Sequence, residues 1–237
     1  MAIQVPLSWL RDFVSINIAP GQLADRLTTA GLEVETIEKV GDSWGNYCVV
    51  GQIKEIRKHP NADTLYLVDV EFGADVPITI VTGAPNIREM EGNIPKPTPK
   101  VALALAGAML VDANHEDRPL KKLKTAKIRG IKSEGMLCSE LELGLSEDHE
   151  GILILPEEAP VGTLLNEYLG DVILHFDIKG GFSHLLSILG IGREVAALTE
   201  ETLDQSVIPD VSNLKVLEQP PFVDLEIKDT DICSRYS

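Results

Sequence analysis

The chain has 237 residues, of which 44% are hydrophobic and 24% are charged, and this composition excludes a fully disordered protein. Its 37 acidic residues outnumber 21 basic ones, and the net charge of −16 argues, over the whole chain, against a nucleic-acid partner. No apolar run approaches the roughly 18 residues of a membrane-spanning helix, no secretion signal is visible, and three scattered cysteines favour a reducing, cytoplasmic setting.

The first forty residues predict two helices followed by a strand. Apolar residues at helical spacing indicate a short helix over 7–14 and a second helix that starts after Pro20 and ends at Gly31. Residues 32–40 alternate between apolar and charged side chains, which is typical of a half-buried strand.

The periodicity then changes to short strands between Gly, Pro, Asn and Asp turns. The predicted strands cover residues 48–56, 64–72, 77–83, 100–107, 127–139 and 151–156. Regular short strands with turn signals favour a small all-β barrel, such as the oligonucleotide-binding (OB) fold.

After the barrel the pattern returns to helix and strand. Residues 172–178 read as a strand, and Ser183 is placed as the N-cap of a helix that runs to Thr199. Neither flank is long enough to bury a core alone, whereas the two together are. We therefore predict an α+β protein in which a small discontinuous α+β domain (1–41 and 156–200) contains an inserted OB-fold barrel (42–155). A linker and the beginning of one more strand fill 201–237.

Charge is divided unevenly along the chain. Residues 51–132 hold 13 basic and 10 acidic residues, a local charge of +3, while the rest of the chain carries −19. The stretch from Arg118 to Lys132 contains no acidic residue, which fits either a solvated basic face or an anion-binding surface for RNA. The candidate RNA-binding residues are Lys54, Lys58, Asn61, Lys121, Lys122, Lys124, Lys127, Arg129, Lys132 and Ser133.

No catalytic constellation emerges from the motifs. Phosphate-binding loops, nucleophile elbows and zinc-protease signatures are missing, and none of the five histidines has metal-ligand spacing with a cysteine. The Gly180-Gly181 pair favours a hinge between strand and helix over an anion cradle. Cys138 has no neighbouring base in the sequence and is expected to be a small buried side chain. We predict no catalytic residue and no metal site.

Three phrases in the predicted barrel carry a resemblance to a known domain. They are HPNAD at 59–63, VTGAPNI at 81–87 and KIRGIKSEGMLCSELELGL at 127–145. Together, in this order, they resemble the tRNA-binding OB domain shared by several synthetase-associated proteins. Only Tyr66 and Phe72 offer rings for base stacking within the strands, so we expect weak binding dominated by charge.

The flanks narrow the resemblance. Residues 1–14, 23–35, 148–163 and 190–198 are similar to the N-terminal part of the bacterial phenylalanyl-tRNA synthetase β chain. The resemblance implies a fragment of a longer chain that joins an α chain in an (αβ)₂ tetramer and charges tRNA(Phe) with phenylalanine. It implies ATP and Mg²⁺ for the full enzyme and no cofactor in this fragment, and it makes the last strand the start of a domain that proofreads mischarged tyrosine.

One segment departs from the family pattern. Where family members read Asp-Ile-Thr-Pro-Asn-Arg, this chain has Lys179-Gly180-Gly181-Phe182 after Asp177-Ile178, which puts a role carried by the missing Arg in doubt. Two alternatives stay open: a purely protein-packing module, and a free-standing tRNA-binding OB-fold protein.

Overall fold

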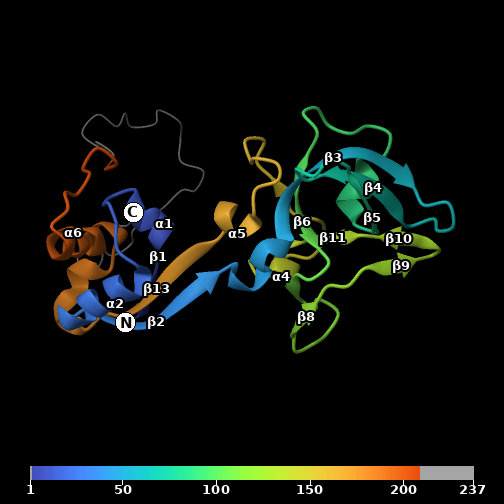
Figure 1. Cartoon of the computed structure of the whole chain (residues 1–237). Helices are drawn as coiled ribbons and strands as arrows, with labels where there is room; N and C mark the ends of the chain where they lie inside the picture. The colour runs from blue at the N-terminus through green and yellow to red at the C-terminus, as the bar shows by residue number, and fades with distance from the viewer. Residues whose placement is uncertain (1, 209–237) are drawn as a thin grey trace, which may run out of the picture. The chain divides into compact units, whose positions relative to one another are not determined.

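The computed structural model describes residues 2–208. Contacts between residues group the chain up to Leu203 into one compact unit, which ends before Asp204. This unit mixes helices with antiparallel sheets (Figure 1), in agreement with the predicted α+β class. The expected strand at 222–227 and most of the expected linker lie outside the described residues.

A three-stranded antiparallel sheet in the order β1-β13-β2 organises the two ends of this unit. Its strands are β1 (Ala2–Pro6), β13 (Asp171–Asp177) and β2 (Glu33–Val40). Leu174 pairs with Val5 on one side and with Ile37 on the other. Strand β1 was not predicted, because its five residues are too few for a periodic pattern and Pro6 reads as the start of a helix.

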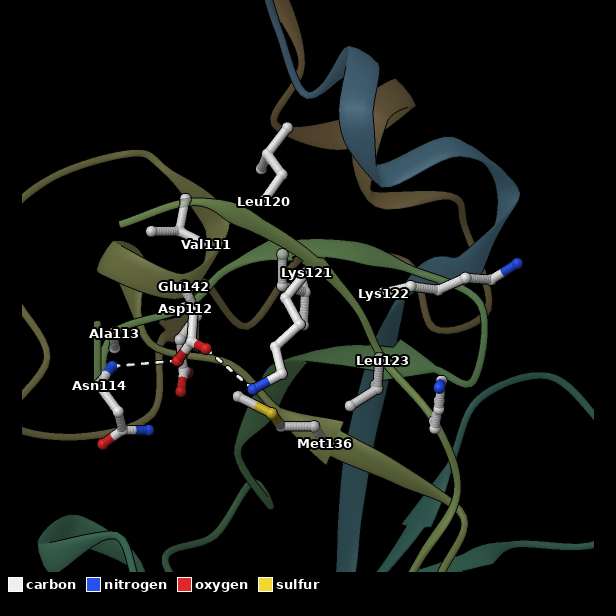
Figure 2. Close-up of a pocket in the computed structure, with 12 residues that line it drawn as sticks. Val111, Asp112, Ala113, Asn114, Leu120, Lys121, Lys122, Leu123, Met136 and Glu142 are labelled. Atoms are coloured by element: carbon white, nitrogen blue, oxygen red, sulfur yellow. Dashed lines mark hydrogen bonds and ion pairs between the residues drawn. The ribbon is translucent and has the colours of Figure 1, made fainter. Parts of the chain in front are cut away.

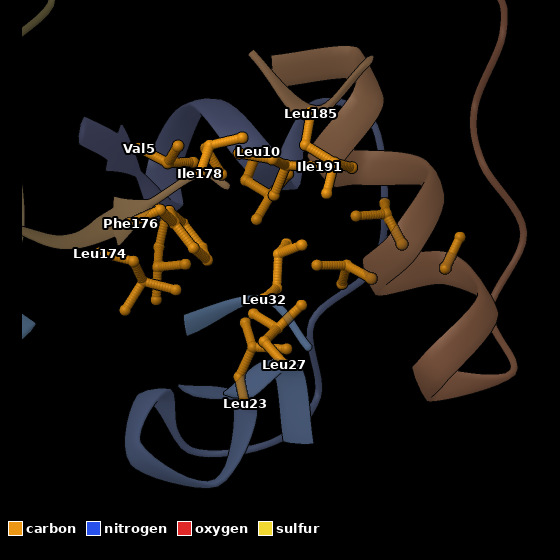
Figure 3. Packing of buried hydrophobic residues seen from close by; sticks show 14 residues of the cluster. Val5, Leu10, Leu23, Leu27, Leu32, Leu174, Phe176, Ile178, Leu185 and Ile191 are labelled. Atoms are coloured by element: carbon orange, nitrogen blue, oxygen red, sulfur yellow. The ribbon is translucent and has the colours of Figure 1, made fainter. Parts of the chain in front are cut away.

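Three helices bury one core against this sheet (Figure 3). They are α1 (Leu7–Arg11), α2 (Pro20–Thr29) and α6 (Ile188–Thr199). The core residues come from both flanks of the sequence, 5–32 and 174–196, with Leu10, Leu27 and Phe176 fully buried among them. The two flanks therefore share one core, although the exact domain boundaries stay a prediction.

Helix ends follow local chemistry, with one correction. Helix α2 starts at Pro20, where the missing N–H has no partner to lose, and Gly31 after its end has a φ of +101°. Helix α6 is capped by Ser187, whose Oγ accepts a hydrogen bond from the Gly190 N–H at 3.0 Å. The predicted cap at Ser183 is wrong, because Gly180–Leu185 forms a separate 3₁₀ segment, η2, before the helix.

The larger sheet has the ladder order β11-β6-β3-β4-β5, with β12 also paired to β6. Its strands are β3 (Cys48–Lys58), β4 (Tyr66–Glu71), β5 (Ile78–Thr82), β6 (Lys100–Leu105), β11 (Gly135–Leu137) and β12 (Ile154–Leu155). Neighbouring residues of β3 face opposite sides, so Val50 joins a core around Trp44 while Val49 joins a second core around Ile53.

Several short elements were not predicted separately from the sequence. They are η1 (Asp42–Tyr47), α3 (Pro85–Glu89), β7 (Met109–Val111), β8 (Leu120–Lys122), β9 (Ala126–Ile128), β10 (Ile131–Ser133), α4 (Glu140–Leu143) and α5 (Leu165–Tyr168). The region 127–139, predicted as one strand, is divided among β9, β10 and β11 because a turn interrupts it. Within residues 2–208, the ladder does not close from β11 to β5. A backbone hydrogen bond from Glu134 N–H to Thr79 O at 3.3 Å bridges this gap.

Candidate functional site

All three phrases found in the sequence meet at the β9–β10 hairpin, which itself belongs to the third phrase. The loop at 59–63 follows β3 and reaches the hairpin turn through two side chains. His59 Nε2 lies 3.3 Å from Ile128 O, and Asn61 Nδ2 donates to Arg129 O at 3.3 Å. Residues about seventy positions apart therefore form one local structure at this end of the domain.

The VTGAPNI phrase reaches the same hairpin through Ser133. The Ser133 Oγ accepts a hydrogen bond from Val81 N–H at 3.0 Å and donates to Gly135 O at 3.0 Å. Ser133 is only 3% exposed. It therefore fastens β10 to β5, which Figure 1 shows beside each other, and it does not face a ligand. We therefore do not count Ser133 among the residues that can contact an anion.

The hairpin turn has an unusual backbone. Ile128 pairs with Ile131, which leaves Arg129 and Gly130 as a two-residue loop. Their φ angles are +47° and +98°. Positive φ at both positions is the pattern of a type I′ turn, which favours Asn-Gly and matches the twist of the strands. Arginine at the first position is exposed and held in the left-handed region.

Acidic neighbours neutralise some of the predicted cations but not others. Ion pairs join Arg118 to Glu147, Lys121 to Asp112 at 2.9 Å and Lys132 to Glu134 at 2.6 Å. Within the described residues, four exposed cations of the basic stretch have no ion pair: Lys122, Lys124, Lys127 and Arg129. These four are the part of the predicted set that is available to an anion.

A cleft of about 620 Å³ lies beside strand β8 (Figure 2). Its lining combines the apolar side chains of Leu123 and Met136 with the lysines of β8. Lys121 Nζ reaches Asp112, and this hydrogen bond, with a second one from Asn114 N–H, lowers the pKa of the Asp112 carboxyl. Two carboxylates, Asp112 and Glu142, line the same cleft, so its lining is of mixed charge.

The two predicted cations on β3 are less available. Lys54 forms an ion pair with Glu71, and Lys58 Nζ lies 3.6 Å from Glu91 Oε1. Both side chains remain at least partly exposed, so these pairs are weak. They nevertheless reduce the field that Lys54 and Lys58 present to a polyanion.

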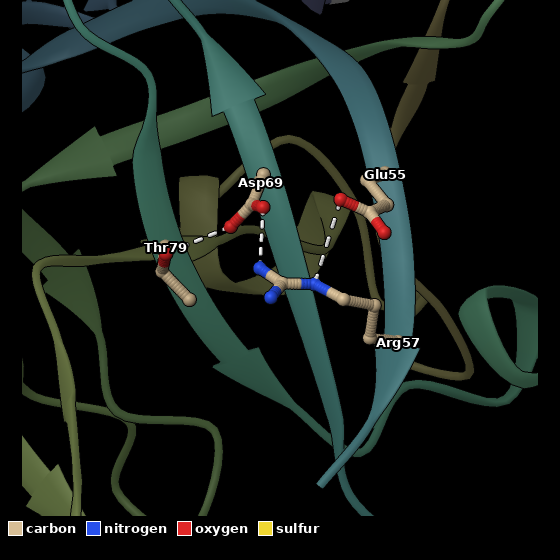
Figure 4. A network of polar contacts seen from close by, with 4 residues as sticks. All are labelled: Glu55, Arg57, Asp69 and Thr79. Carbon is tan, nitrogen blue, oxygen red and sulfur yellow. Dashed lines mark hydrogen bonds and ion pairs between the residues drawn. The ribbon is translucent and has the colours of Figure 1, made fainter.

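Arg57 on the same strand is compensated in the same way (Figure 4). Its guanidinium pairs with Asp69 and lies 3.6 Å from Glu55. Asp69 also accepts a hydrogen bond from Thr79 Oγ1 at 2.7 Å, which ties β4 to β5. The outer face of β3 and β4 is therefore a network of mixed charge, whereas four cations between Lys122 and Arg129 form no ion pair within the described residues.

The two aromatic candidates do not form a stacking platform. Tyr66 is 3% exposed and belongs to the core around Ile53, and Phe72 is half-buried against the same core. This arrangement leaves charge as the main attraction that these strands offer to RNA.

Both described cysteines are buried free thiols. Burial raises the pKa of the Cys48 thiol to about 12 and that of Cys138 well above its usual value. A raised pKa suppresses the reactive thiolate, so the expectation that Cys138 is a buried apolar side chain is confirmed. In residues 2–208 no group of three or more His, Cys, Asp or Glu could hold a metal ion, and no helix is long and apolar enough to cross a membrane.

Sequence reasoning overlooked His59. It lies in the phrase at 59–63, of which only Asn61 was predicted as a site residue. His59 is 4% exposed at the end of β3. A polar ring at the end of a buried strand requires hydrogen-bond partners. This requirement was the signal in the sequence that could have identified His59. Its partner Ile128 is too distant in sequence to be identified that way.

Comparison with known proteins identifies related sequences. Residues 48–164 match a family model described as "Putative tRNA binding domain". Over 99% of its length the chain is 41% identical to the phenylalanine–tRNA ligase β subunit of Dehalococcoides mccartyi and 40% identical to that of Syntrophus aciditrophicus. The chain spans only 27% of the length of each of these relatives.

Similarity to solved structures is weaker. A MetRS-related protein from Pyrococcus horikoshii is 27% identical, with 51% of this chain and 89% of that chain covered and a TM-score of 0.34. A TM-score this low does not establish a common fold.

Proposed function

Because this chain is a homologue of part of the phenylalanine–tRNA ligase β subunit and its residues 48–164 match a tRNA-binding domain, we propose that it is a tRNA-binding and structural part of such a subunit. In the complete enzyme it would join an α chain in an (αβ)₂ tetramer in the cytoplasm and support ATP-dependent charging of tRNA(Phe) with phenylalanine. We propose that none of the described residues binds ATP or Mg²⁺ and that this chain contributes binding surface to the enzyme.

We propose that the larger sheet is an OB-fold barrel inserted into a discontinuous α+β domain. The core built from residues 5–32 and 174–196 supports the discontinuous domain, since the inserted strands contribute none of its buried members. The contact of β5 with β10 and β11 supports the barrel. The barrel would then be closed by direct backbone hydrogen bonds together with hydrogen bonds through side chains.

The four unpaired cations carry the proposal. Lys122, Lys124, Lys127 and Arg129 lie within the matched domain, and no acidic side chain among the described residues neutralises them. The rest of the chain is strongly acidic, so a polyanion is repelled elsewhere and attracted here. Such a surface recognises the backbone and shape of RNA more than its sequence.

Salt dependence tests the proposal directly. If four phosphates are neutralised, log K against log salt falls with a slope of about −3, so affinity drops about 50-fold between about 50 and 200 mM salt. The measurement is fluorescence anisotropy of a labelled tRNA(Phe) transcript. Replacing the four cations by Gln should flatten the slope, while Lys54→Gln, which removes an ion-paired lysine, should change it little. Binding that is indifferent to salt would refute the proposal.

A packing role has one observation in its favour. Phe182 and Leu186 are 40% and 37% exposed around segment η2, an arrangement that can contact another protein chain. Gel filtration with the α chain, with and without tRNA, separates the two roles. Equal complex formation without tRNA favours packing, and tRNA-dependent complex formation favours the RNA-binding role.

A further inference from the structure

The hairpin turn at Arg129-Gly130 is held by two side chains of the loop at 59–63. Asn61 donates to the carbonyl of Arg129, and His59 bonds the carbonyl of Ile128. Two consecutive carbonyls of one turn are thus fixed by residues from outside the hairpin. The Asn61 amide also lies 3.9 Å from the position that a Cβ would take at Gly130.

The hydrogen bonds of His59 indicate which ring nitrogen is the acceptor. Nδ1 receives the Asn61 backbone N–H at 3.1 Å, so Nδ1 must be an unprotonated acceptor. The proton of the neutral ring is then on Nε2, which donates to Ile128 O. Both ring nitrogens are satisfied, which is the condition for burying an imidazole to 4% exposure.

Stability alone does not explain the arginine. A left-handed backbone is costly for a side chain with a Cβ, and Asn-Gly is the favoured pair in this turn. Among residues 2–208, only three other than glycine have a positive φ, and Arg129 is one of them. Within the described residues, the Arg129 guanidinium forms no ion pair.

We propose that Arg129 is the principal RNA-backbone contact of the chain, and that His59 and Asn61 are positioning residues that hold its turn. The planar guanidinium presents donors in a fork that fits two oxygens of a phosphate, which an ammonium group cannot do. Lys127 on the same hairpin supplies a further point charge. This inference rests on the proposed function, because it assumes that the bound anion is tRNA.

Two substitutions at Arg129 distinguish a geometrically specific contact with phosphate from a general electrostatic attraction. One diffusely acting charge is worth about fivefold in affinity at about 0.1 M salt. Arg129→Asn should weaken tRNA affinity at least 20-fold while raising Tm by about 2 °C, since Asn suits the turn. Arg129→Lys keeps the charge and should still weaken affinity at least fivefold. The matched control, Lys127→Gln, should cost only about fivefold.

Variants of His59 test the positioning role. His59→Ala removes the hydrogen bond to Ile128 O and should weaken affinity about tenfold, measured well below its Tm. His59→Gln restores a donor for Ile128 O and should recover at least half of the lost binding free energy. A purely structural histidine would lower Tm without altering the affinity of the folded protein. Wild-type affinity in both Arg129→Lys and His59→Ala would overturn the inference while tRNA binding itself stands.

Failure of the proposed function looks different in the same assay. In that case the unaltered chain shows no salt-sensitive binding to the labelled transcript, and the inference falls with it. A wild-type chain that binds with a slope of about −3 but shows equal losses for Arg129→Asn and Lys127→Gln retains the function and rejects the special role of Arg129.

Discussion

Lys127 and Lys132 lie directly opposite each other across the β9–β10 hairpin. Like charges at facing positions of an antiparallel pair are destabilising. Lys132 is partly compensated by Glu134 at 2.6 Å, whereas Lys127 has no acidic partner among the described residues. The hairpin is therefore electrostatically unfavourable by itself, and a phosphate bound there, as we propose, would relieve the repulsion.

Reversing one of these charges should separate stability from binding. Lys127→Glu places opposite charges face to face and should raise the free energy of unfolding by about 0.3 kcal/mol. The same change should weaken tRNA affinity by more than tenfold, because it removes an attraction and adds a repulsion. Urea unfolding and fluorescence anisotropy measure the two effects. Lys127→Gln is the control, with less effect on both, and a loss of stability in Lys127→Glu would contradict this prediction.

Ser133 should matter for folding. Ser133→Ala leaves the buried Val81 N–H without its acceptor, so the free energy of unfolding should fall by about 1–3 kcal/mol. Ser146→Ala, which removes an exposed hydroxyl bonded to Glu140, should cost less than about 0.5 kcal/mol. Below its unfolding transition the Ser133 variant should bind tRNA as the wild type does. A large loss of affinity at full folding would return Ser133 to the residues that can contact an anion.

Sequence patterns predicted those parts of the fold that depend on local periodicity. The main strands were predicted from short runs between turn residues, and the structure shows that neighbouring residues such as Val49 and Val50 enter different cores. The cap of α6 was misplaced because Ser183 and Ser187 are equally suitable residue types. Only the position of the preceding 3₁₀ segment, which buries Leu185 in the core, decides between them.

The candidate site was predictable in composition but not in availability. The acid-free stretch from Arg118 to Lys132 is visible in the sequence. Which of its cations remain unpaired depends on tertiary neighbours, as in the pairing of Arg118 with Glu147. The role of His59 likewise depends on a carbonyl 69 residues away.

The buried thiols predict a loss of stability at alkaline pH. The pKa of Cys48 is raised from 9.0 to about 12 by burial, so above pH 9 the unfolded chain loses this proton while the folded chain keeps it. The free energy of unfolding should be unaffected by this group below about pH 8 and should fall by about 1.4 kcal/mol per pH unit between 9 and 12. Urea titrations from pH 8 to 11 on wild type and Cys48→Ala should show a shallower slope in the variant. Parallel slopes would contradict the burial argument.

The glycine pair before α6 should tolerate, and gain from, alanine. Neither Gly180 nor Gly181 has a positive φ, and a Cβ built on either meets nothing within 4 Å. Gly181→Ala should therefore raise the free energy of unfolding by about 0.4–1 kcal/mol, because it restricts the unfolded chain without straining the folded one.

Gly31→Ala provides the matched control for that substitution. Gly31 has a φ of +101°, so the same added methyl group forces a left-handed backbone and should destabilise by more than the Gly181 change stabilises. Urea titrations of the two variants should show changes of opposite sign in the free energy of unfolding. That result would show that the junction before α6, which lacks the rigid turn typical of the family, has no structural need for glycine. If Gly181→Ala also destabilises the protein, the junction between β13 and α6 requires a backbone conformation that alanine resists. The flexibility of glycine would then contribute to the packing of β13 and α6.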